Sequence, residues 1–282
     1  MYAEPALMTS AGRHAPLLTG LPASVPELAA VGHGLLIHEH ITGPYGVELT
    51  DAERQNVHVR RLEQILGHVL SISDAPLTEA RPPERRAAAN CRHFTVFLVA
   101  ALRAHGVPAR ARCGFGMYFR EGYGEDHWVA EYHNAAENRW VLVDGQLDAV
   151  QRELFHVGFD VTDVPRDGFL VAADAWRRCR AGEFDPARFG LSFLEEGGWW
   201  WIAGNMMRDA AALENVEVLP WDTWGVMPGP DDPVDMDLFD ALAAATISPD
   251  DTVAERRELM SDERLRVPSK VRNALRDELE DL

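Results

Sequence analysis

Apolar positions recur with the period of a helix in the first hundred residues and with the period of a strand directly afterwards. Residues 28–40 and 50–70 are each predicted to be helical. Thr50 is a candidate N-cap for the second of these helices, because Glu53 stands three residues further on. The prolines after residue 81 interrupt the chain before the next apolar segment.

The best-marked helix is predicted over residues 90–105. Asn90 can cap its start, and Gly106, followed by a Val-Pro pair, ends it. Phe94 and Phe97 belong to an apolar set with helical spacing that nearly encircles the segment. We therefore expect a central helix that is covered on most sides.

Period-two patterns follow this helix. In residues 109–119 the odd positions are apolar, whereas arginines occupy even positions such as Arg110 and Arg112. Residues 127–133 and 139–144 are predicted to be two further strands, joined by a turn-rich connection of hairpin length. Together with the helices, these strands predict an α+β fold.

The second half of the chain has weaker signals. Short helices are predicted at residues 172–181 and 205–214, and a tryptophan-rich strand at 199–202. Residues 228–233 are rich in proline and acid and predict a linker. A further helix is predicted to start at 248–251, where a serine, a proline and two aspartates suit a helix N-terminus.

These segments predict three parts. Residues 1–25 have no clear periodicity and are expected to form a poorly ordered lead-in. Residues 26–227 are expected to form the main domain. Residues 228–282 are expected to form an acidic linker and C-terminal helices, either a solvated surface or an oligomer contact.

Charge and composition exclude several partners. The 282 residues carry a formal net charge of −18, which disfavours both nucleic acid and anionic membrane surfaces. No apolar run reaches the roughly 20 residues that span a bilayer, and no secretory signal is visible at the start. Three cysteines without CxxC spacing argue against a disulfide framework and a cysteine-rich zinc site, so a reducing cytoplasm is expected.

Cys91 is the first candidate for chemistry. It is expected in the first turn of the central helix, where unpaired N–H groups and the helix dipole lower a thiol pKa, and Arg92 adds positive charge. A thiolate is a strong nucleophile. The alternative is a small buried hydrophobic residue, the commonest role of a lone cysteine.

His127 and Asp144 bracket the predicted hairpin. With a loop over 135–138, His127 lies opposite position 146; with a loop over 134–137, it lies directly opposite Asp144. Either register keeps the pair close enough for the carboxylate to orient the imidazole. Taken singly, His127 is more often a water-exposed strand end and Asp144 a turn residue.

Taken together, four segments resemble the core of the transglutaminase-like superfamily. They read Asn90-Cys91-Arg92-His93-Phe94, Leu102-Arg103-Ala104-His105-Gly106-Val107-Pro108-Ala109-Arg110, Asp126-His127-Trp128-Val129-Ala130-Glu131-Tyr132 and Trp140-Val141-Leu142-Val143-Asp144. The resemblance covers about residues 85–150, roughly a quarter of the chain.

The resemblance implies a papain-like cysteine protease fold, in which a central helix carrying the cysteine packs on an antiparallel sheet carrying the histidine and the aspartate. It implies a catalytic triad of nucleophile Cys91, general base and acid His127, and orienting carboxylate Asp144. One departure is His93, where relatives often carry an acid; this change leaves the triad intact but could alter the charge of the site.

By this resemblance the chain is a thiol enzyme, an amidase, protease or acyl transferase, that acts on a peptide or small-molecule amide through an acyl-thioester. Neither a cofactor nor a metal is implied. The backbone N–H of Cys91 is one expected oxyanion donor. For the second donor Gln55 and Gln64 are candidates by residue type only, and both are more often solvated helix residues.

Other residues offer weaker signals. His33, His38 and His40, with Glu39, could hold a metal, but no further spaced ligands accompany them and the segment is predicted to be helical. The tryptophans are expected to pack in a core or interface rather than line a groove; they are Trp199, Trp200, Trp201, Trp221 and Trp224. The other cysteines, Cys113 and Cys179, are expected to be buried thiols.

Three classes of function remain. The first is the cysteine-dependent enzyme. The second is a catalytically silent module that keeps the fold and binds a peptide or protein, against which the presence of all three triad residue types argues. The third is a metal-dependent hydrolase built on the histidine cluster, whose activity a chelator would abolish.

Overall fold

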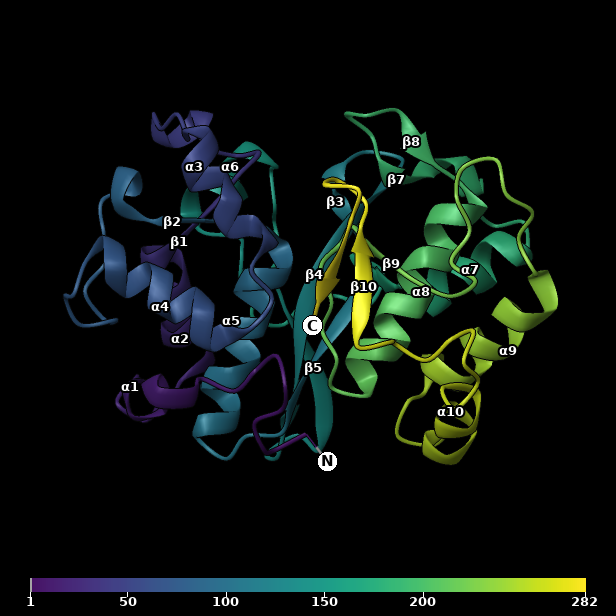
Figure 1. The fold of residues 1–282 in the computed structure, drawn as a ribbon, viewed down its shortest axis with the longest axis horizontal. Coiled ribbons are helices and arrows are strands. Elements are labelled where there is room, and N and C mark those ends of the chain that lie inside the picture. Colours follow the sequence, from purple (N-terminus) through teal and green to yellow (C-terminus); the bar gives the residue numbers. More distant parts are fainter. Residues whose placement is uncertain (1) are drawn as a thin grey trace. The chain divides into compact units, whose positions relative to one another are not determined.

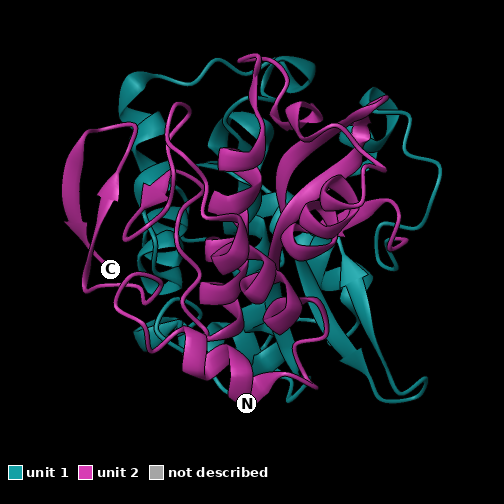
Figure 2. Ribbon diagram, turned by 90° about the vertical axis from the view of Figure 1, so that its right-hand side faces the viewer, with its two compact units in different colours: residues 1–111, 129–164 teal, residues 112–128, 165–282 magenta. Residues whose placement is uncertain are grey.

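The computed structural model describes residues 2–282 and divides into two compact units, each with helices and strands (Figure 1). Unit 1 comprises residues 1–111 and 129–164, and unit 2 comprises 112–128 and 165–282 (Figure 2). Two long strands, β3 (Ala109–Arg120) and β4 (Tyr123–Asn134), begin or end in one unit and continue in the other. The predicted α+β class is confirmed.

Unit 1 is built around α5, which spans Cys91–Ala104 and is buried from Cys91 to Arg103. It contacts α1, α2 and α4, as the predicted central helix should (Figure 1). The other elements of this unit are α1 (Ala15–Thr19), α2 (Val25–Leu35), α3 (Asp51–Arg54), α4 (Leu62–Ile72), α6 (Ala149–Leu154), β1 (Leu36–His38), β2 (Ala87–Ala89), β5 (Arg139–Val143) and short 3-10 turns at Gly12–His14, Gly43–Tyr45, Gln55–His58 and Pro83–Arg85.

Both ends of α5 follow the predicted signals. Asn90 and His93 form a capping box at its start. At its end Gly106 adopts a left-handed conformation, with a φ of 74°. The N–H of Gly106 donates to the carbonyl of Arg103 and that of Val107 to the carbonyl of Leu102, which together close a Schellman motif.

Two predicted helices are shorter than expected. The predicted helix over residues 28–40 ends at Leu35, and β1 follows it because residues 36–38 pair in parallel with β2. The predicted 50–70 helix starts at Thr50 with the expected capping box, but then breaks into α3, a 3-10 turn and α4.

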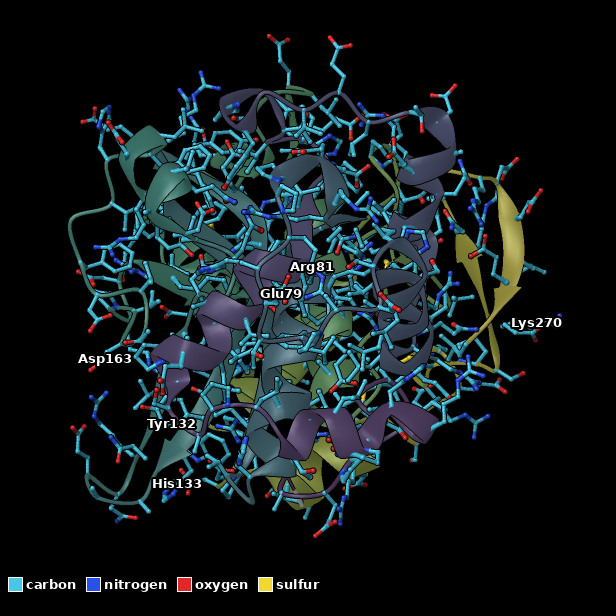
Figure 3. All side chains as sticks on the ribbon, turned by 90° about the vertical axis from the view of Figure 1, so that its left-hand side faces the viewer. Glu79, Arg81, Tyr132, His133, Asp163 and Lys270 are labelled. Atoms are coloured by element: carbon cyan, nitrogen blue, oxygen red, sulfur yellow. The ribbon has the colours of Figure 1, made fainter. Side chains whose placement is uncertain are left out.

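A loop in unit 1 is fixed by one buried arginine. Arg81 donates hydrogen bonds to the carbonyl oxygens of Ala75 and Pro76, both at 2.6 Å, and to that of Glu79. Figure 3 labels Arg81 and Glu79 beside one another. One guanidinium thus replaces the backbone partners that an irregular segment lacks.

Unit 2 packs three helices around one apolar cluster. Helices α7 (Ala172–Arg180), α8 (Trp199–Leu213) and α9 (Met236–Ile247) contact one another pairwise, and Trp176, Met206 and Phe239 are fully buried among them. The predicted strand over residues 199–202 is wrong, because Trp199, Trp200 and Trp201 lie in the first turn of α8. Helix α10 (Val253–Leu259) begins just after residues 248–251, where a helix start was predicted.

The strands of unit 2 form two sheets. In the larger sheet the order is β6–β3–β4–β7–β8, with β6 at Phe169–Val171, β7 at Phe189–Leu191 and β8 at Glu196–Gly197; β5 of unit 1 also pairs with β4 in this sheet. The smaller sheet orders β11 (Glu278–Asp281), β10 (Lys270–Asn273) and β9 (Asp222–Thr223). A 3-10 turn covers Pro186–Arg188. Within residues 2–282, no helix combines the length and the apolar character that crossing a bilayer requires.

Candidate active site

Cys91 is the first residue of α5, as predicted. Its side chain is buried but retains 7% exposure. The hydroxyl of Thr95, four residues further along the helix, donates a hydrogen bond to the carbonyl oxygen of Cys91 at 3.1 Å. The N–H groups of a first helical turn have no partner within the helix, and Cys91 stands among them.

His93, the departure from the family pattern, is completely buried. Its Nδ1 lies 2.8 Å from Oδ1 of Asn90, and burial, reinforced by the neighbouring Arg92, lowers its pKa well below 6.5. The imidazole is therefore neutral at physiological pH. Its structural task is to complete the cap of the helix that carries Cys91.

Asp144 directly follows β5 and is fully buried. Its N–H donates to the carbonyl of Val161 at 2.8 Å, and its Oδ1 accepts from the N–H of Gln146 at 2.9 Å. A hydrogen bond from a backbone N–H helps to hold the carboxylate in one orientation. A carboxylate held in this way can in turn orient an imidazole.

The hairpin of β4 and β5 has the first of the two registers considered. Ala130 pairs with Val143 and Asn134 with Arg139, so the loop covers residues 135–138. The alternative register, which sets His127 directly opposite Asp144, is wrong. Local turn signals could not decide this, because Asn134 is an equally good loop residue and instead accepts hydrogen bonds from the loop N–H groups through its side chain.

Gly145 connects Asp144 to the central helix. A Cβ added at Gly145 would lie 3.1 Å from Cδ2 of Leu98 and 3.7 Å from the carbonyl oxygen of Phe94. Both belong to α5, and Phe94 lies one turn after Cys91. Unit 1 thus brings the cysteine helix directly against the segment that carries Asp144.

His127 belongs to unit 2 and is 2% exposed, so it is not the water-exposed strand end that a lone histidine usually is. Its ring packs edge-on against Phe119, with ring centroids 4.8 Å apart, and stands 6.2 Å from Tyr118 and 6.3 Å from Phe169. These aromatic rings restrict the orientation of the imidazole. Its approach to Cys91 stays a prediction.

The first histidines of the cluster lie at the end of a helix and on a strand, whereas a single helix was predicted. Because β1 pairs with β2, His38 is opposite Ala89, and the N–H of Glu39 donates to the carbonyl of Ala89 at 2.8 Å. Burial raises the pKa of Glu39 to about 7, against the opposing effect of Arg54. From the sequence, Glu39 was considered only as a possible metal ligand on a helix, although β-branched residues around the histidines are typical of a strand.

This cluster does not have the arrangement of a metal site. The His38 and His40 ring centroids are 5.8 Å apart, and the N–H of His40 donates to Nδ1 of His38. Across residues 2–282, histidine, cysteine, aspartate and glutamate side chains form no group of three or more that could hold a metal ion.

The two glutamines considered as oxyanion donors are exposed. Gln55 donates to the carbonyl of Asp51 at 3.4 Å, and Gln64 lies on the outer face of α4. A buried amide of the same unit is Gln146, whose Nε2 donates to Oε1 of Gln151 at 2.9 Å. The N–H of Cys91 stays the expected donor.

The other cysteines and most of the tryptophans pack as predicted, but Trp199 and Trp200 also line a groove, which was not predicted. The indole of Trp199 meets that of Trp176 with ring centroids 4.8 Å apart, and Trp224 donates to the carbonyl of Leu265. Cys113 and Cys179 are buried, as predicted, and neither forms a disulfide. Burial, with Asp185 nearby, raises the pKa of the Cys179 thiol to about 12.

The middle of the chain matches a known family. Residues 58–145 match the family described as the transglutaminase-like superfamily, and the matched segment includes Cys91, His127 and Asp144. The resemblance predicted from the sequence is thereby confirmed, and it extends further towards the N-terminus than predicted. No curated protein matches the chain.

A solved structure named "Putative Cysteine Protease from Cytophaga hutchinsonii" is similar to 62% of this chain, at 16% identity and a TM-score of 0.33. The alignment covers 47% of that protein's chain, so this chain spans about half of its length. A likeness at this level is too remote to inform the fold or the function.

Proposed function

We propose that the chain is a cysteine-dependent enzyme of acyl chemistry, in which Cys91, His127 and Asp144 act as a triad on a peptide or small-molecule amide. The observation that carries the proposal is the match of residues 58–145 to the transglutaminase-like superfamily, with Cys91 at the start of a buried, capped helix. The packing of Gly145 against that helix supports the part played by Asp144.

Continuity of β4 supports the part played by His127. The strand is unbroken from Tyr123 to Asn134, and it pairs with β5 as far as Ala130 and Val143, the residue before Asp144. At about 3.3 Å per residue, His127 lies about 10 Å along the strand from Ala130. Continued in the same register, Asp144 lies opposite position 129, which is two residues along the strand from His127.

In the proposed reaction the Cys91 sulfur attacks the carbonyl carbon of the amide, and the N–H of Cys91 stabilises the developing oxyanion. The C–N bond then breaks while His127 gives its proton to the departing amine, which leaves an acyl-thioester. Water or a second amine, deprotonated by His127, attacks the thioester and restores the thiolate. Asp144 keeps the imidazole in the required tautomer.

The matched control for the nucleophile is within the chain. Cys179 is 6% exposed and Cys91 is 7% exposed, so access to solvent hardly separates them. The raised pKa of Cys179, about 12, leaves it almost entirely a thiol at neutral pH. Since only the thiolate reacts, we expect iodoacetamide to modify Cys91 at least about tenfold faster than Cys179 at neutral pH.

Peptide mapping by mass spectrometry gives both rates from one sample. Equal rates at the two sites would refute an activated Cys91. Intact-mass detection of an acyl group on Cys91 after exposure to amide, peptide and thioester libraries then tests the reaction, with Cys91→Ser as the control. A silent binding module would instead retain its partner unchanged in Cys91→Ala.

The chemistry proposed needs neither metal nor cofactor, and a chelator should leave it intact. We further propose a reducing compartment such as the cytoplasm, because none of the three cysteines forms a disulfide. Whether the acidic C-terminal segment forms a homo-oligomer contact is decided by measuring the mass of the native protein in solution.

A further inference from the structure

Unit 2 contains an open groove at the start of α8, separate in sequence from the matched segment. Its volume is about 660 Å³, within the range of sites that hold drug-sized ligands. The groove is lined by Trp199 and Trp200 of α8, by the strand β8 before them, and by residues from Pro230 to Met236.

Two indoles in the groove are held in place. Trp200 donates its Nε1–H to the carbonyl of Gly197 at 3.0 Å, and its ring meets that of Trp201 with centroids 4.8 Å apart. Trp199 is fixed edge-on against Trp176. Both groove tryptophans remain partly exposed, so binding a ligand here requires little ordering of the walls.

The charged side chains that line the groove with these indoles are all acidic. Glu195, Glu196 and Asp232 line the groove and are exposed, and none of the described residues lining it is basic. Asp232 is held in place, since its Oδ2 accepts the N–H of Gly229 at 2.9 Å. Indole faces beside carboxylates attract ammonium and guanidinium groups.

Two exposed apolar residues come directly before the groove residues in the chain. Phe193 and Leu194, 59% and 52% exposed, immediately precede Glu195. Large apolar side chains at such exposure, next to a groove, are typical of a surface that contacts another chain. A lone small cation would leave both uncovered, whereas a peptide that presents a cation would cover them.

We propose that this groove binds a peptide segment through an arginine or lysine side chain, independently of the acyl chemistry proposed for Cys91. The cationic head lies between the indoles and the carboxylates of Glu195, Glu196 and Asp232. Apolar neighbours in the peptide lie against Phe193 and Leu194.

Calorimetric titration of the full chain with a blocked leucine–arginine–leucine peptide tests this proposal, with the citrulline counterpart as the uncharged match. We expect the citrulline peptide to bind at least about tenfold more weakly. Glu195→Gln with Glu196→Gln should weaken the arginine peptide about fivefold or more, and Trp200→Leu should weaken it about threefold.

The net charge of −18 could attract any basic peptide, so a control must remove the same charge elsewhere. Glu255→Gln with Glu278→Gln does this at exposed positions of unit 2 outside the groove. The control should bind the arginine peptide as the wild type does. Equal weakening in both double variants, equal binding of the citrulline peptide, or absence of binding would each overturn the proposal.

Discussion

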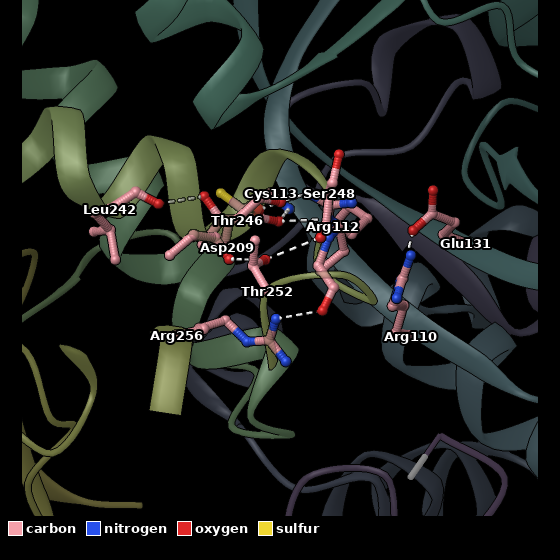
Figure 4. Close-up of polar contacts among 12 residues, drawn as sticks. Arg110, Arg112, Cys113, Glu131, Asp209, Leu242, Thr246, Ser248, Thr252 and Arg256 are labelled. Atoms are coloured by element: carbon pink, nitrogen blue, oxygen red, sulfur yellow. Dashed lines mark hydrogen bonds and ion pairs between the residues drawn. The ribbon is translucent and has the colours of Figure 1, made fainter. Parts of the chain in front are cut away.

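Arg112 and Asp209 form a two-pronged ion pair in which both side chains are almost completely buried. Nε of Arg112 lies 3.0 Å from Oδ1 of Asp209, and Nη2 lies 2.8 Å from Oδ2 (Figure 4). Oδ1 also accepts the N–H of Cys113, and Nη2 reaches the carbonyl of Thr246. The pair therefore links β3, α8 and the end of α9 within unit 2.

Removing one partner of this pair should be costly. Asp209→Ala leaves a buried guanidinium without its counterion, and we expect the free energy of unfolding to fall by about 3–5 kcal/mol. Urea denaturation followed by circular dichroism measures the change. Asp163→Ala, which breaks the exposed pair with Arg139, is the control and should have a far smaller effect. Equal losses in the two variants would contradict a special role for burial.

The neutral state of His93 makes stability depend on pH. Its pKa is depressed in the folded protein, whereas the unfolded chain takes up a proton near pH 6.5. The stabilisation is thus complete above pH 6.5 and is lost as pH falls below it, by up to about 2 kcal/mol at pH 5.

His93→Gln tests this dependence, because glutamine at this capping position can still accept the N–H of Asn90. We expect the variant to lose less stability between pH 7 and pH 5 than the wild type does. Urea denaturation at several pH values gives both slopes. Parallel slopes would mean that His93 does not titrate as its burial requires.

Glu39 should make the stability of the protein depend on pH in the opposite direction to His93. Its pKa rises from 4.5 to about 7 on folding, so the unfolded chain loses its proton first as pH rises. Stability from the protonated carboxyl is present below pH 4.5 and is lost as pH rises through 7. Glu39→Gln should therefore gain about 1–3 kcal/mol relative to the wild type between pH 5 and pH 8. The exposed Glu84→Gln is the control, and a gain of the same size there would contradict the assignment.

Gly145 offers a test of the contact between α5 and the Asp144 segment. In Gly145→Val the added carbons press on Leu98, which should destabilise the protein by about 1–3 kcal/mol. By displacing Asp144 from the helix of Cys91, it should also slow the proposed acylation. Gly158→Val is the control, since nothing lies within 4 Å of a Cβ there. Wild-type labelling of Cys91 in the folded Gly145→Val protein would argue against a role for this contact.

Features governed by neighbouring residues could be predicted from the sequence. The cap at Asn90, the stop at Gly106 and the capping box at Thr50 depend on residues within a few positions, and all three are present. The hairpin was also predictable, because its strands are joined by a short loop. These features place Cys91 and Asp144 on their elements.

Features governed by distant residues could not be predicted. Strand β1 exists because it pairs with β2, about fifty residues later in the chain. Arg112 occupies an even position that usually faces water, but Asp209, nearly a hundred residues away, supplies its buried partner. A short apolar run such as 199–202 fits a strand as well as a helix, and contacts of α8 with α7 and α9 favour the helix.

The chain passes between its two units three times, after residues 111, 128 and 164. During synthesis on the ribosome, every residue of unit 1 has been made once position 164 is reached. The tip of the β3–β4 hairpin, which includes His127, must then wait for β6 and β7 to emerge before its sheet partners exist. At about 5–20 residues per second, β7 is complete only seconds later. The residues of the Cys91 helix are therefore synthesised well before the strands that complete the sheet of His127, and the pairing proposed for these two residues must await those strands.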